Sequence, residues 1–267
     1  MIDKAIILAA GMGNRISRVS HTPKPLLPLD GKDGPTFLDW HLWSLAKAGV
    51  EEVYLVGNPK TFGTQLRAMR DVKATWILNP TEDVSTSGSG HSAWFAFNAP
   101  HNILDGKSRV ILMDADILYD PSIYATLAAD TRAESKTLVC SDYRETDEEV
   151  MVFAPEARPD VPCWHGKGLL GTPMAADASC LGEATGILLW EPQDHAALRA
   201  TTEWVIRFST AKTRSEHEDL TQRMMHQQRL VALGIGREIP FMECDTPEEY
   251  HIVTQEMYPR LRSLLNL

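Results

Sequence analysis

Short apolar runs alternate with segments of helical periodicity along most of the chain, and this alternation constrains the fold more than any other feature. The apolar runs have the length of strands buried on both faces, and they cover residues 4–10, 53–56, 74–78, 109–113 and 137–140. Apolar residues at helical spacing cover 37–48, 89–97, 123–129, 193–208 and 218–228. Strands that alternate with helices form a mainly parallel sheet with helices on both faces. We therefore predict an α/β fold with three layers and a mixed, mainly parallel sheet.

The pattern loosens after the fifth strand, where Pro155, Pro159 and Pro162 interrupt the chain. We interpret residues 141–185 as an inserted segment packed over the edge of the sheet, and residues 1–267 as a single domain. Further strands are predicted at 149–154, 185–190 and 239–243, with a last helix from residue 247 onward.

Charge and composition exclude several classes of protein. The formal net charge is −10, so a nucleic-acid-binding surface is not expected. An anionic substrate would need a local group of Arg and Lys, or a divalent cation. No apolar run reaches the roughly 20 residues of a membrane span, the first residues lack a secretion signal, and the four cysteines have no metal-binding spacing. We expect a cytoplasmic protein with reduced thiols, and the sequence leaves its oligomeric state open, a homo-oligomer included.

A glycine turn follows the first predicted strand. Gly11 and Gly13 would let the backbone N–H groups approach and cradle a phosphate. Ile16 replaces the third glycine of a dinucleotide-binding fingerprint, so that motif is excluded. Two basic residues make the turn specific: Arg15 follows it, and Lys24 stands between two prolines that fix its backbone.

Acidic residues follow two of the predicted strands. Asp114 and Asp116 end the fourth strand, where a carboxylate pair suits Mg²⁺, although Asp116 could also cap the next loop. The same DxD pattern occurs in glycosyltransferases that use nucleotide sugars. Asp245 precedes Thr-Pro-Glu-Glu, which is also a good helix start.

Small polar residues open the predicted helix at 89–97. Asn79, Ser87 and Gly88 could donate hydrogen bonds to a polar ligand, or could form a plain flexible loop. Farther on, the acids of Glu216-His217-Glu218-Asp219 suit a first helical turn for dipole reasons alone. No further His or Cys completes a zinc site around His217.

The run Leu-Ala-Ala-Gly-Met-Gly-Asn-Arg at 8–15, with Pro-Lys-Pro-Leu-Leu at 23–27, resembles the signature of the nucleotidyltransferases that activate sugar phosphates and phospho-alcohols. Later landmarks of the family occur in the same order, so the resemblance covers nearly the whole chain. It implies a Rossmann-like domain of the nucleotidyltransferase type, in which a nucleoside triphosphate condenses with a phosphate monoester and pyrophosphate leaves. It also implies Mg²⁺ as cofactor, and direct attack of the acceptor on the α-phosphorus.

The resemblance assigns roles to individual residues. The catalytic cations are Arg15 and Lys24, and the metal ligands are Asp116 and Asp245. The nucleotide-binding residues are Leu8, Ala9, Ala10, Gly11, Gly13, Asn79, Ser87, Gly88 and Asp114. The acceptor-binding residues are Tyr143, Lys167, Glu183 and Asp219. Because a loop lysine buries little apolar area, we expect loss of Lys24 to lower turnover while leaving stability nearly unchanged.

Two segments favour the cytidylyltransferase branch, whose acceptors are phosphocholine and aminoalkyl phosphonates. These are Thr-Ser-Gly-x-x-x-Ser at 86–92, and the insertion with its Gly-Lys at 166–167 and Gly-Glu at 182–183. CTP is therefore the favoured nucleotide. Val150 stands near the place where phosphocholine enzymes carry a tryptophan for cation–π contact, which disfavours choline, although Trp164, Trp190 or Tyr143 could substitute.

Three alternatives stay open on the sequence. The first is a sugar-1-phosphate nucleotidyltransferase that uses UTP, dTTP or GTP. The second is a DxD glycosyltransferase, which would release a nucleoside diphosphate and would not need Arg15 and Lys24. The third is a nucleotide-binding regulator without catalysis, which the presence of both aspartates and both cations disfavours.

Overall fold

The computed structural model describes residues 1–11, 13, 15–16, 21–81, 86–143, 149–173, 176–208 and 215–266. Several residues that the sequence motifs include lie outside this part of the chain, namely Met12, Asn14, Val84, Ser85, Arg144 and Glu145.

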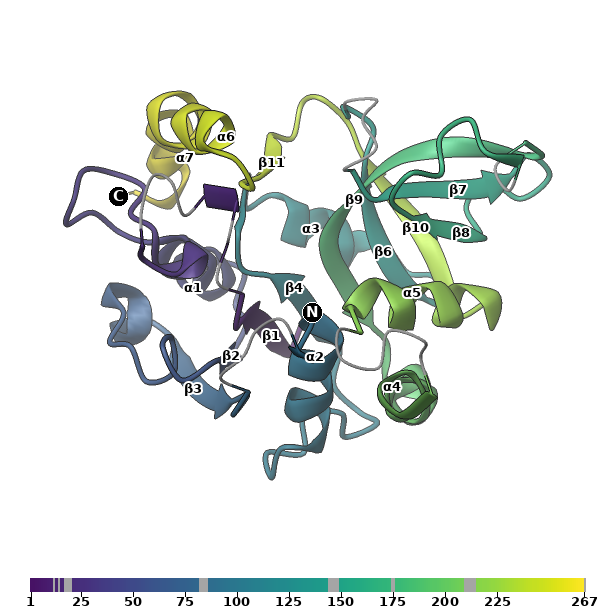
Figure 1. The fold of residues 1–267 in the computed structure, drawn as a ribbon, viewed down its shortest axis with the longest axis horizontal. Coiled ribbons are helices and arrows are strands. Elements are labelled where there is room, and N and C mark those ends of the chain that lie inside the picture. Colours follow the sequence, from purple (N-terminus) through teal and green to yellow (C-terminus); the bar gives the residue numbers. More distant parts are fainter. Residues whose placement is uncertain are drawn as a thin grey trace.

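A mixed sheet forms the centre of the molecule (Figure 1), as the alternating pattern predicts. Its main path follows the order β10 (Leu230–Ile235), β6 (Ser135–Cys140), β9 (Ala178–Trp190), β4 (Val110–Asp114), β1 (Lys4–Ala9), β2 (Glu52–Gly57) and β3 (Lys73–Leu78). Four neighbouring strands, from β4 to β3, run parallel. β9 is antiparallel to both of its neighbours on this path, β4 and β6. The carboxyl ends of the parallel strands therefore meet at one edge, where ligands bind in such sheets.

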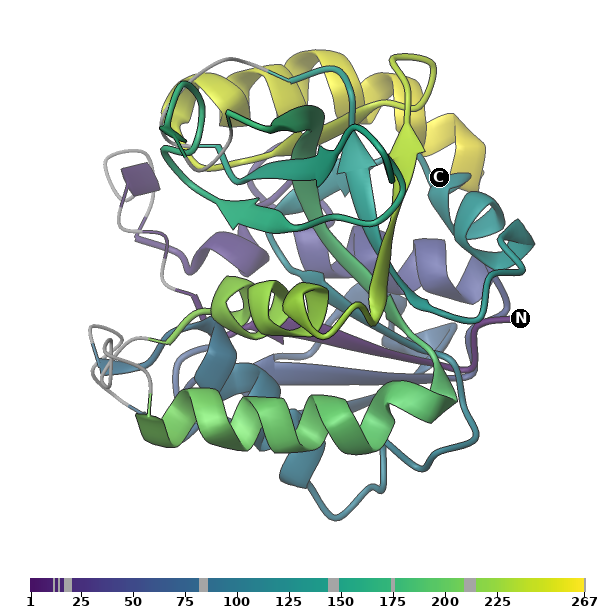
Figure 2. The ribbon, with the colours of Figure 1, turned by 90° about the vertical axis from the view of Figure 1, so that its right-hand side faces the viewer.

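Alternate residues of the central strand β1 enter two different cores. Ala5 and Ile7 pack on the side that holds α1 (Phe37–Lys47) and the C-terminal helices. Ile6 and Leu8 pack on the side of α2 (Ser89–Asn98), α4 (His195–Phe208) and α5 (His217–His226). Helices therefore cover both faces of the sheet, which confirms the three layers. In Figure 2 the C-terminal helices lie at the top of the molecule and α4 lies at the bottom.

Local sequence fixes the bounds of α1. Thr36 caps the helix: its hydroxyl accepts a hydrogen bond from the Asp39 N–H, and the Asp39 carboxylate accepts one from the Thr36 N–H. After the helix, Gly49 adopts a φ of +78°, which glycine enters without steric cost.

The inserted segment joins the sheet through one long strand. β7 (Met151–Pro155) pairs with β8 (Trp164–Gly166) and with the first half of β9. The second half of β9 pairs with β4 in the main sheet. The insertion is therefore a continuation of the sheet, whereas the sequence suggested packing over its edge.

The fold also includes two short strands and three further helices. The short strands β5 (Ile117–Tyr119) and β11 (Phe241–Glu243) form a separate antiparallel pair. The helices are α3 (Ile123–Ala129), α6 (Pro247–Ile252) and α7 (Tyr258–Leu261), of which α6 begins at a capping box formed by Thr246 and Glu249.

No helix in the described ranges is long and apolar enough to cross a bilayer. All four cysteines are free thiols.

Candidate active site

A cavity of about 500 Å³ opens at the carboxyl ends of β1 and β4. It lies where the topology of a parallel sheet places ligands. Its lining comes mainly from the glycine turn, the short helical turn at Lys24, the starts of α2 and α5, the β4–β5 connection and the segment after β11. Residues that follow β2 and β3, and Lys167 of the inserted segment, complete it.

The glycine turn is built around Lys24. Gly13 has a φ of +65°, and a Cβ added there would lie 2.7 Å from the Cβ of Lys24. Only glycine therefore allows this close approach. On the other side of the turn, Asn58 donates a hydrogen bond of 2.6 Å to the Ala10 carbonyl, which holds the end of β1 in place.

Three carboxylates meet at one wall of the cavity. Asp116, Glu243 and Asp245 each offer one oxygen atom, and these atoms lie within 4.8 Å of one another. We call these three residues the acidic cluster. The β5–β11 pair brings them together, because Ile117 lies opposite Glu243 and the Cys244 N–H donates a hydrogen bond of 2.9 Å to the Asp116 carbonyl.

The ammonium group of Lys24 lies between two members of the cluster. Its Nζ is 2.6 Å from Oδ2 of Asp116 and also contacts Asp245, while only 4% of the residue is exposed. Burial alone would lower the pKa of Lys24, but the carboxylates outweigh burial and raise it. Arg15 makes a second ion pair with Asp245. Two cations therefore offset a group of negative charges that would otherwise repel one another.

Glu243 is the third member of the cluster, and it is half-buried. Burial, followed by the charges of Asp116 and Asp245, raises its pKa well above the usual range for glutamate. Three converging carboxylate oxygens form a hard donor set of the kind that Mg²⁺ prefers, with room for phosphate oxygens and water. The residues present therefore fit a divalent cation.

A second charged group surrounds His217 at the start of α5. Nε2 of His217 is 3.6 Å from Oδ2 of Asp114, and Nδ1 is 3.2 Å from Oε2 of Glu218. Burial opposes protonation of the ring, but the two carboxylates raise the pKa of His217 to about 10. Burial raises the pKa of Asp114 to about 7, although His217 opposes this shift. The pKa of Glu218 falls to about 2 because the charge of His217 outweighs burial.

The start of α2 is tied to the start of α5. The Ser89 N–H and hydroxyl donate hydrogen bonds of 2.7 and 2.8 Å to Oε2 of Glu216. The Gly90 N–H donates one of 2.9 Å to the Ser215 carbonyl. A Cβ on Gly88 would lie 2.4 Å from that same carbonyl oxygen, so glycine is required for this packing. Nearby, the buried Asn79 amide donates to the hydroxyl groups of Ser87 and Ser92.

Comparison with known proteins identifies the family. A family model described as a MobA-like NTP transferase domain matches residues 5–180, well over half of the chain. The chain belongs to the MobA-like NTP transferase family. This match confirms the family that the resemblance of residues 8–15 and 23–27 implied.

Several relatives of this NTP transferase carry more detailed names. The chain is 32% identical over 136 residues to CMP-5'-(3-aminopropyl)phosphonate synthase from Streptomyces rubellomurinus, covering 49% of this chain and 20% of that protein. It is 45% identical over 53 residues to D-glycero-alpha-D-manno-heptose 1-phosphate guanylyltransferase from Aneurinibacillus thermoaerophilus, covering 20% of this chain and 22% of that protein. The chain therefore spans less than a quarter of the length of these two curated relatives.

Solved structures share the whole fold. The inositol-1-phosphate CTP transferase from T. maritima superposes with a TM-score of 0.74 at 18% identity, covering 99% of this chain and 96% of that one. A UDP-glucose pyrophosphorylase complexed with UDP-glucose also gives a TM-score of 0.74, at 15% identity, covering 97% of this chain and 100% of that one. These matches confirm the predicted Rossmann-like fold of the nucleotidyltransferase type.

Most residues predicted for the site line the cavity of this NTP transferase. They are Leu8, Ala10, Gly11, Gly13, Arg15, Lys24, Asn79, Ser87, Gly88, Asp114, Asp116, Lys167 and Asp245. Four others do not line it. Ala9 is fully buried in β1, and Asp219 is an exposed residue whose carboxylate accepts a hydrogen bond from the Glu216 N–H, as a helix cap does. Glu183 lies on β9 opposite Cys140, and Tyr143 is half-buried after β6.

Sequence reasoning missed Glu243 and Asn58. Glu243 stands two positions before Asp245, so an extended backbone places both on one face, and this alternation was the available signal. Asn58 directly follows β2, at the same sheet edge as the glycine turn. The aromatic residues considered for a choline site lie elsewhere: Trp190 is fully buried and Trp164 packs edge-on against His226.

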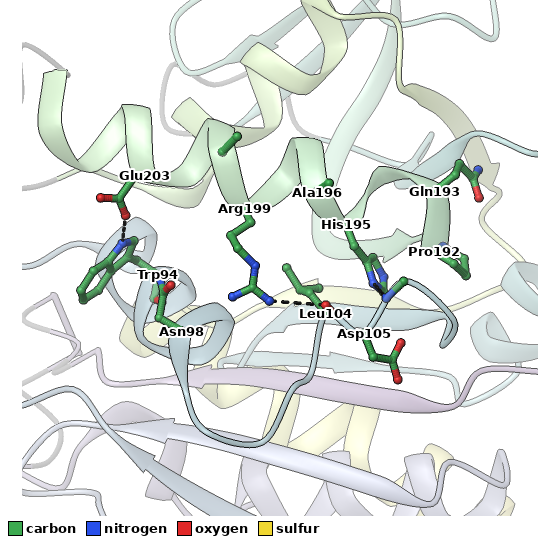
Figure 3. A pocket seen from close by; sticks show the side chains of 12 residues that line it. Trp94, Asn98, Leu104, Asp105, Pro192, Gln193, His195, Ala196, Arg199 and Glu203 are labelled. Carbon is green, nitrogen blue, oxygen red and sulfur yellow. Dashed lines mark hydrogen bonds between the residues drawn. The ribbon is translucent and has the colours of Figure 1, made fainter.

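A second cavity, of about 800 Å³, lies between α2 and α4 (Figure 3). Its polar side chains bond to one another or to the backbone: Trp94 donates to Glu203 at 2.5 Å, and Arg199 donates to the Leu104 carbonyl at 3.4 Å. It also reaches Asp105, in the loop that leads into β4, and therefore lies toward the amino end of that strand. This position and pairing do not suggest a reaction site.

Proposed function

We propose that the protein transfers a cytidylyl group from CTP to a small phosphate or phosphonate monoester, with Mg²⁺ as cofactor and pyrophosphate as product. One observation carries the proposal: the Lys24 ammonium lies between two carboxylates of the acidic cluster, beside the glycine turn. Such an arrangement serves phosphoryl chemistry, in which fixed cations neutralise charge that builds in the transition state.

CTP is proposed from two neighbours. A curated relative is named as a CMP-phosphonate synthase, and a structural neighbour as a CTP transferase. Another relative is named as a guanylyltransferase, so a sugar-1-phosphate enzyme that uses a different nucleotide is the alternative to test.

The site divides into two ends. The glycine turn and the start of α2 would bind the nucleotide, with Arg15 and Lys24 on its phosphates. Lys167, from the inserted segment at 141–185, lines the same cavity and would meet the acceptor anion. No side-chain nucleophile is needed, because the acceptor oxyanion attacks the α-phosphorus directly and pyrophosphate leaves in line.

The acidic cluster would hold the Mg²⁺ ion. When bound, the ion supplies positive charge to the triphosphate oxygens. Lys24 would then exchange a carboxylate partner for phosphate oxygens, and Arg15 would do the same at the rim, where its side chain is half exposed.

A screen tests this function. CTP, UTP, GTP, ATP and dTTP are each combined with phosphocholine, 2-aminoethylphosphonate and sugar phosphates, and pyrophosphate is measured. We expect the highest kcat/KM with CTP and a small phosphate or phosphonate acceptor. A preference for another nucleotide with a sugar phosphate would favour the alternative enzyme. Release of a nucleoside diphosphate would indicate a glycosyltransferase, and tight nucleotide binding without any product would indicate a regulator.

A variant tests the metal site separately. Asp116→Asn keeps the shape of the side chain and removes one carboxylate from the cluster. We expect a folded protein that has lost metal-dependent turnover. Activity near that of the wild type at limiting Mg²⁺ would contradict the assignment.

A further inference from the structure

The acidic cluster depends on a small pair of strands that is separate from the main sheet. Asp116 immediately precedes β5, and Glu243 ends β11. A pair of three-residue strands has few hydrogen bonds of its own and is marginal in isolation. Something beneath it must hold it in one position if its carboxylates are to meet.

Helix α1 supplies that support through two consecutive residues. Nε1 of Trp40 donates a hydrogen bond of 3.2 Å to the carbonyl of Tyr119, the last residue of β5. Nδ1 of His41 lies 2.9 Å from the hydroxyl of the same Tyr119. Both the backbone and the side-chain end of Tyr119 are therefore tied to one rigid helix.

The polar contacts extend below β5 into the core. The Tyr119 hydroxyl is also 2.5 Å from the hydroxyl of Tyr124 on α3, and His41, Tyr119 and Tyr124 are each at most 2% exposed. Burial of such groups is unfavourable unless they bond to one another, and apolar residues of the same size would fill the space without that requirement. We therefore infer that this polar network does more than fill the core.

The ring of His41 also lies near the turn that carries Asp116. Burial lowers the pKa of His41 to about 4, although the Ala115 carbonyl and the charge of Asp116 oppose that shift. The ring is therefore neutral at physiological pH. Its Nε2 makes no hydrogen bond of normal geometry with any described residue, and Ala115 is the residue next to Asp116.

We propose that His41 and Tyr119 are positioning residues that fix the carboxylate of Asp116 toward the acidic cluster. Neither side chain lines the cavity, so each acts through β5 and the turn before it. The inference rests on the proposed function, because it assumes that the cluster holds a divalent cation.

Direct metal binding tests this role without turnover. Mn²⁺ replaces Mg²⁺ as a paramagnetic probe, with CTP present and the acceptor left out, and its Kd is measured from the free Mn²⁺ signal. We expect Tyr119→Phe, which removes one hydroxyl group, to raise the Kd by about tenfold, a typical effect of losing a group that orients a metal ligand. Tyr54→Phe is the matched control, because the Tyr54 hydroxyl bonds to Glu52, and neither residue lines the cavity.

Variants at His41 separate positioning from stability. We expect His41→Leu to weaken Mn²⁺ binding and His41→Gln, which can still donate and accept, to restore part of it. In both Tyr119→Phe and His41→Leu, kcat at saturating metal should stay within about twofold of the wild type while the metal requirement rises. The thermal midpoint of each variant is measured in parallel.

Two results would overturn the inference in different ways. If Asp116→Asn abolishes Mn²⁺ binding while Tyr119→Phe and His41→Leu only lower the thermal midpoint, the network is structural and the proposed function stands. If Asp116→Asn binds Mn²⁺ as the wild type does, the metal site of the proposed function is wrong, and the positioning role falls with it.

Discussion

Gly186 of β9 and Asp114 of β4 approach so closely that a Cβ on Gly186 would lie 2.3 Å from Oδ2 of Asp114. Gly186 also adopts a φ of +69°, a conformation that side chains with a Cβ rarely enter. The position of the Asp114 carboxylate, and hence its ion pair with His217, therefore depends on the absence of a side chain on the neighbouring strand.

Gly186→Ala should damage both the site and the fold. We expect a loss of about 1–2 kcal/mol in the free energy of unfolding from the strained backbone alone. We also expect kcat/KM to fall, because the Asp114 carboxylate must move. Gly234→Ala in β10 is the control, since a Cβ there meets nothing within 4 Å. Chemical denaturation and pyrophosphate release measure the two effects. If both variants had the same free energy of unfolding and the same kcat/KM, the close approach of Gly186 to Asp114 would affect neither stability nor activity.

Lys24→Met should lower kcat by on the order of a hundredfold or more, as removal of a positioned charge often does. The sequence alone suggested little effect on stability, but the structure buries Lys24 against two carboxylates. Loss of their partner leaves charges that repel one another, so we now expect a loss of about 1–3 kcal/mol near neutral pH. Urea unfolding at pH 7 checks this. Lys107→Met, on an exposed loop, is the control. Wild-type stability in Lys24→Met would show that the ion pairs contribute nothing.

The ion pair of His217 predicts a pH dependence of stability. Its pKa in the folded protein is about 10, above its ordinary value of 6.5. The stabilisation from the charged ring is therefore complete below pH 6.5 and is lost as the pH rises through 10. We expect His217→Gln to be less stable than the wild type at pH 7, with a difference that narrows toward pH 10. Denaturation curves at intervals across that range measure it, with the exposed His251→Gln as control. A difference that stays constant with pH would contradict the ion pair.

Lys167→Ala should impair acceptor use and spare the nucleotide. Lys167 lines the cavity from the inserted segment. We expect kcat/KM for the acceptor to fall while the Kd for CTP, measured by calorimetry, stays the same. Weakened CTP binding with an unchanged acceptor constant would reverse our division of the site.

Glu183→Gln, tested with the same acceptors, decides whether Glu183 belongs to the acceptor end. The residue was assigned there by resemblance, but it does not line the cavity. A selective loss with amine-bearing acceptors would retain the assignment, because the lost interaction is between charges. An unchanged acceptor profile would remove it.

The main sheet could be predicted from the sequence because its strands are continuous apolar runs, buried on both faces. The helices between them carry apolar residues at helical spacing. Residues 123–129 were predicted as a helix, and α3 has those bounds. The glycine turn and Lys24 could be recognised because glycine permits backbone conformations that other residues avoid and proline fixes its own φ angle. Residues that follow consecutive parallel strands also meet at one edge in any such sheet, which placed Asp114 beside the glycine turn.

The parts that escaped prediction depend on contacts between distant segments. β5 has three residues, too few to show a period, and its partner β11 lies more than a hundred positions away. The role of Glu243 emerges only from that pairing. The contact of Ser89 with Glu216 likewise requires the start of α2 to meet the start of α5. The glycines at 88 and 90 permit this approach, but glycines alone do not predict it.

The position of Lys24 has a consequence for the order of addition. A tethered ammonium already lies between Asp116 and Asp245, so a divalent cation that arrives alone must compete with it. A triphosphate changes that competition, because its oxygens give the ammonium new partners and release the carboxylates. Free metal should therefore bind poorly to the empty enzyme, and nucleotide and metal should enter together as one complex.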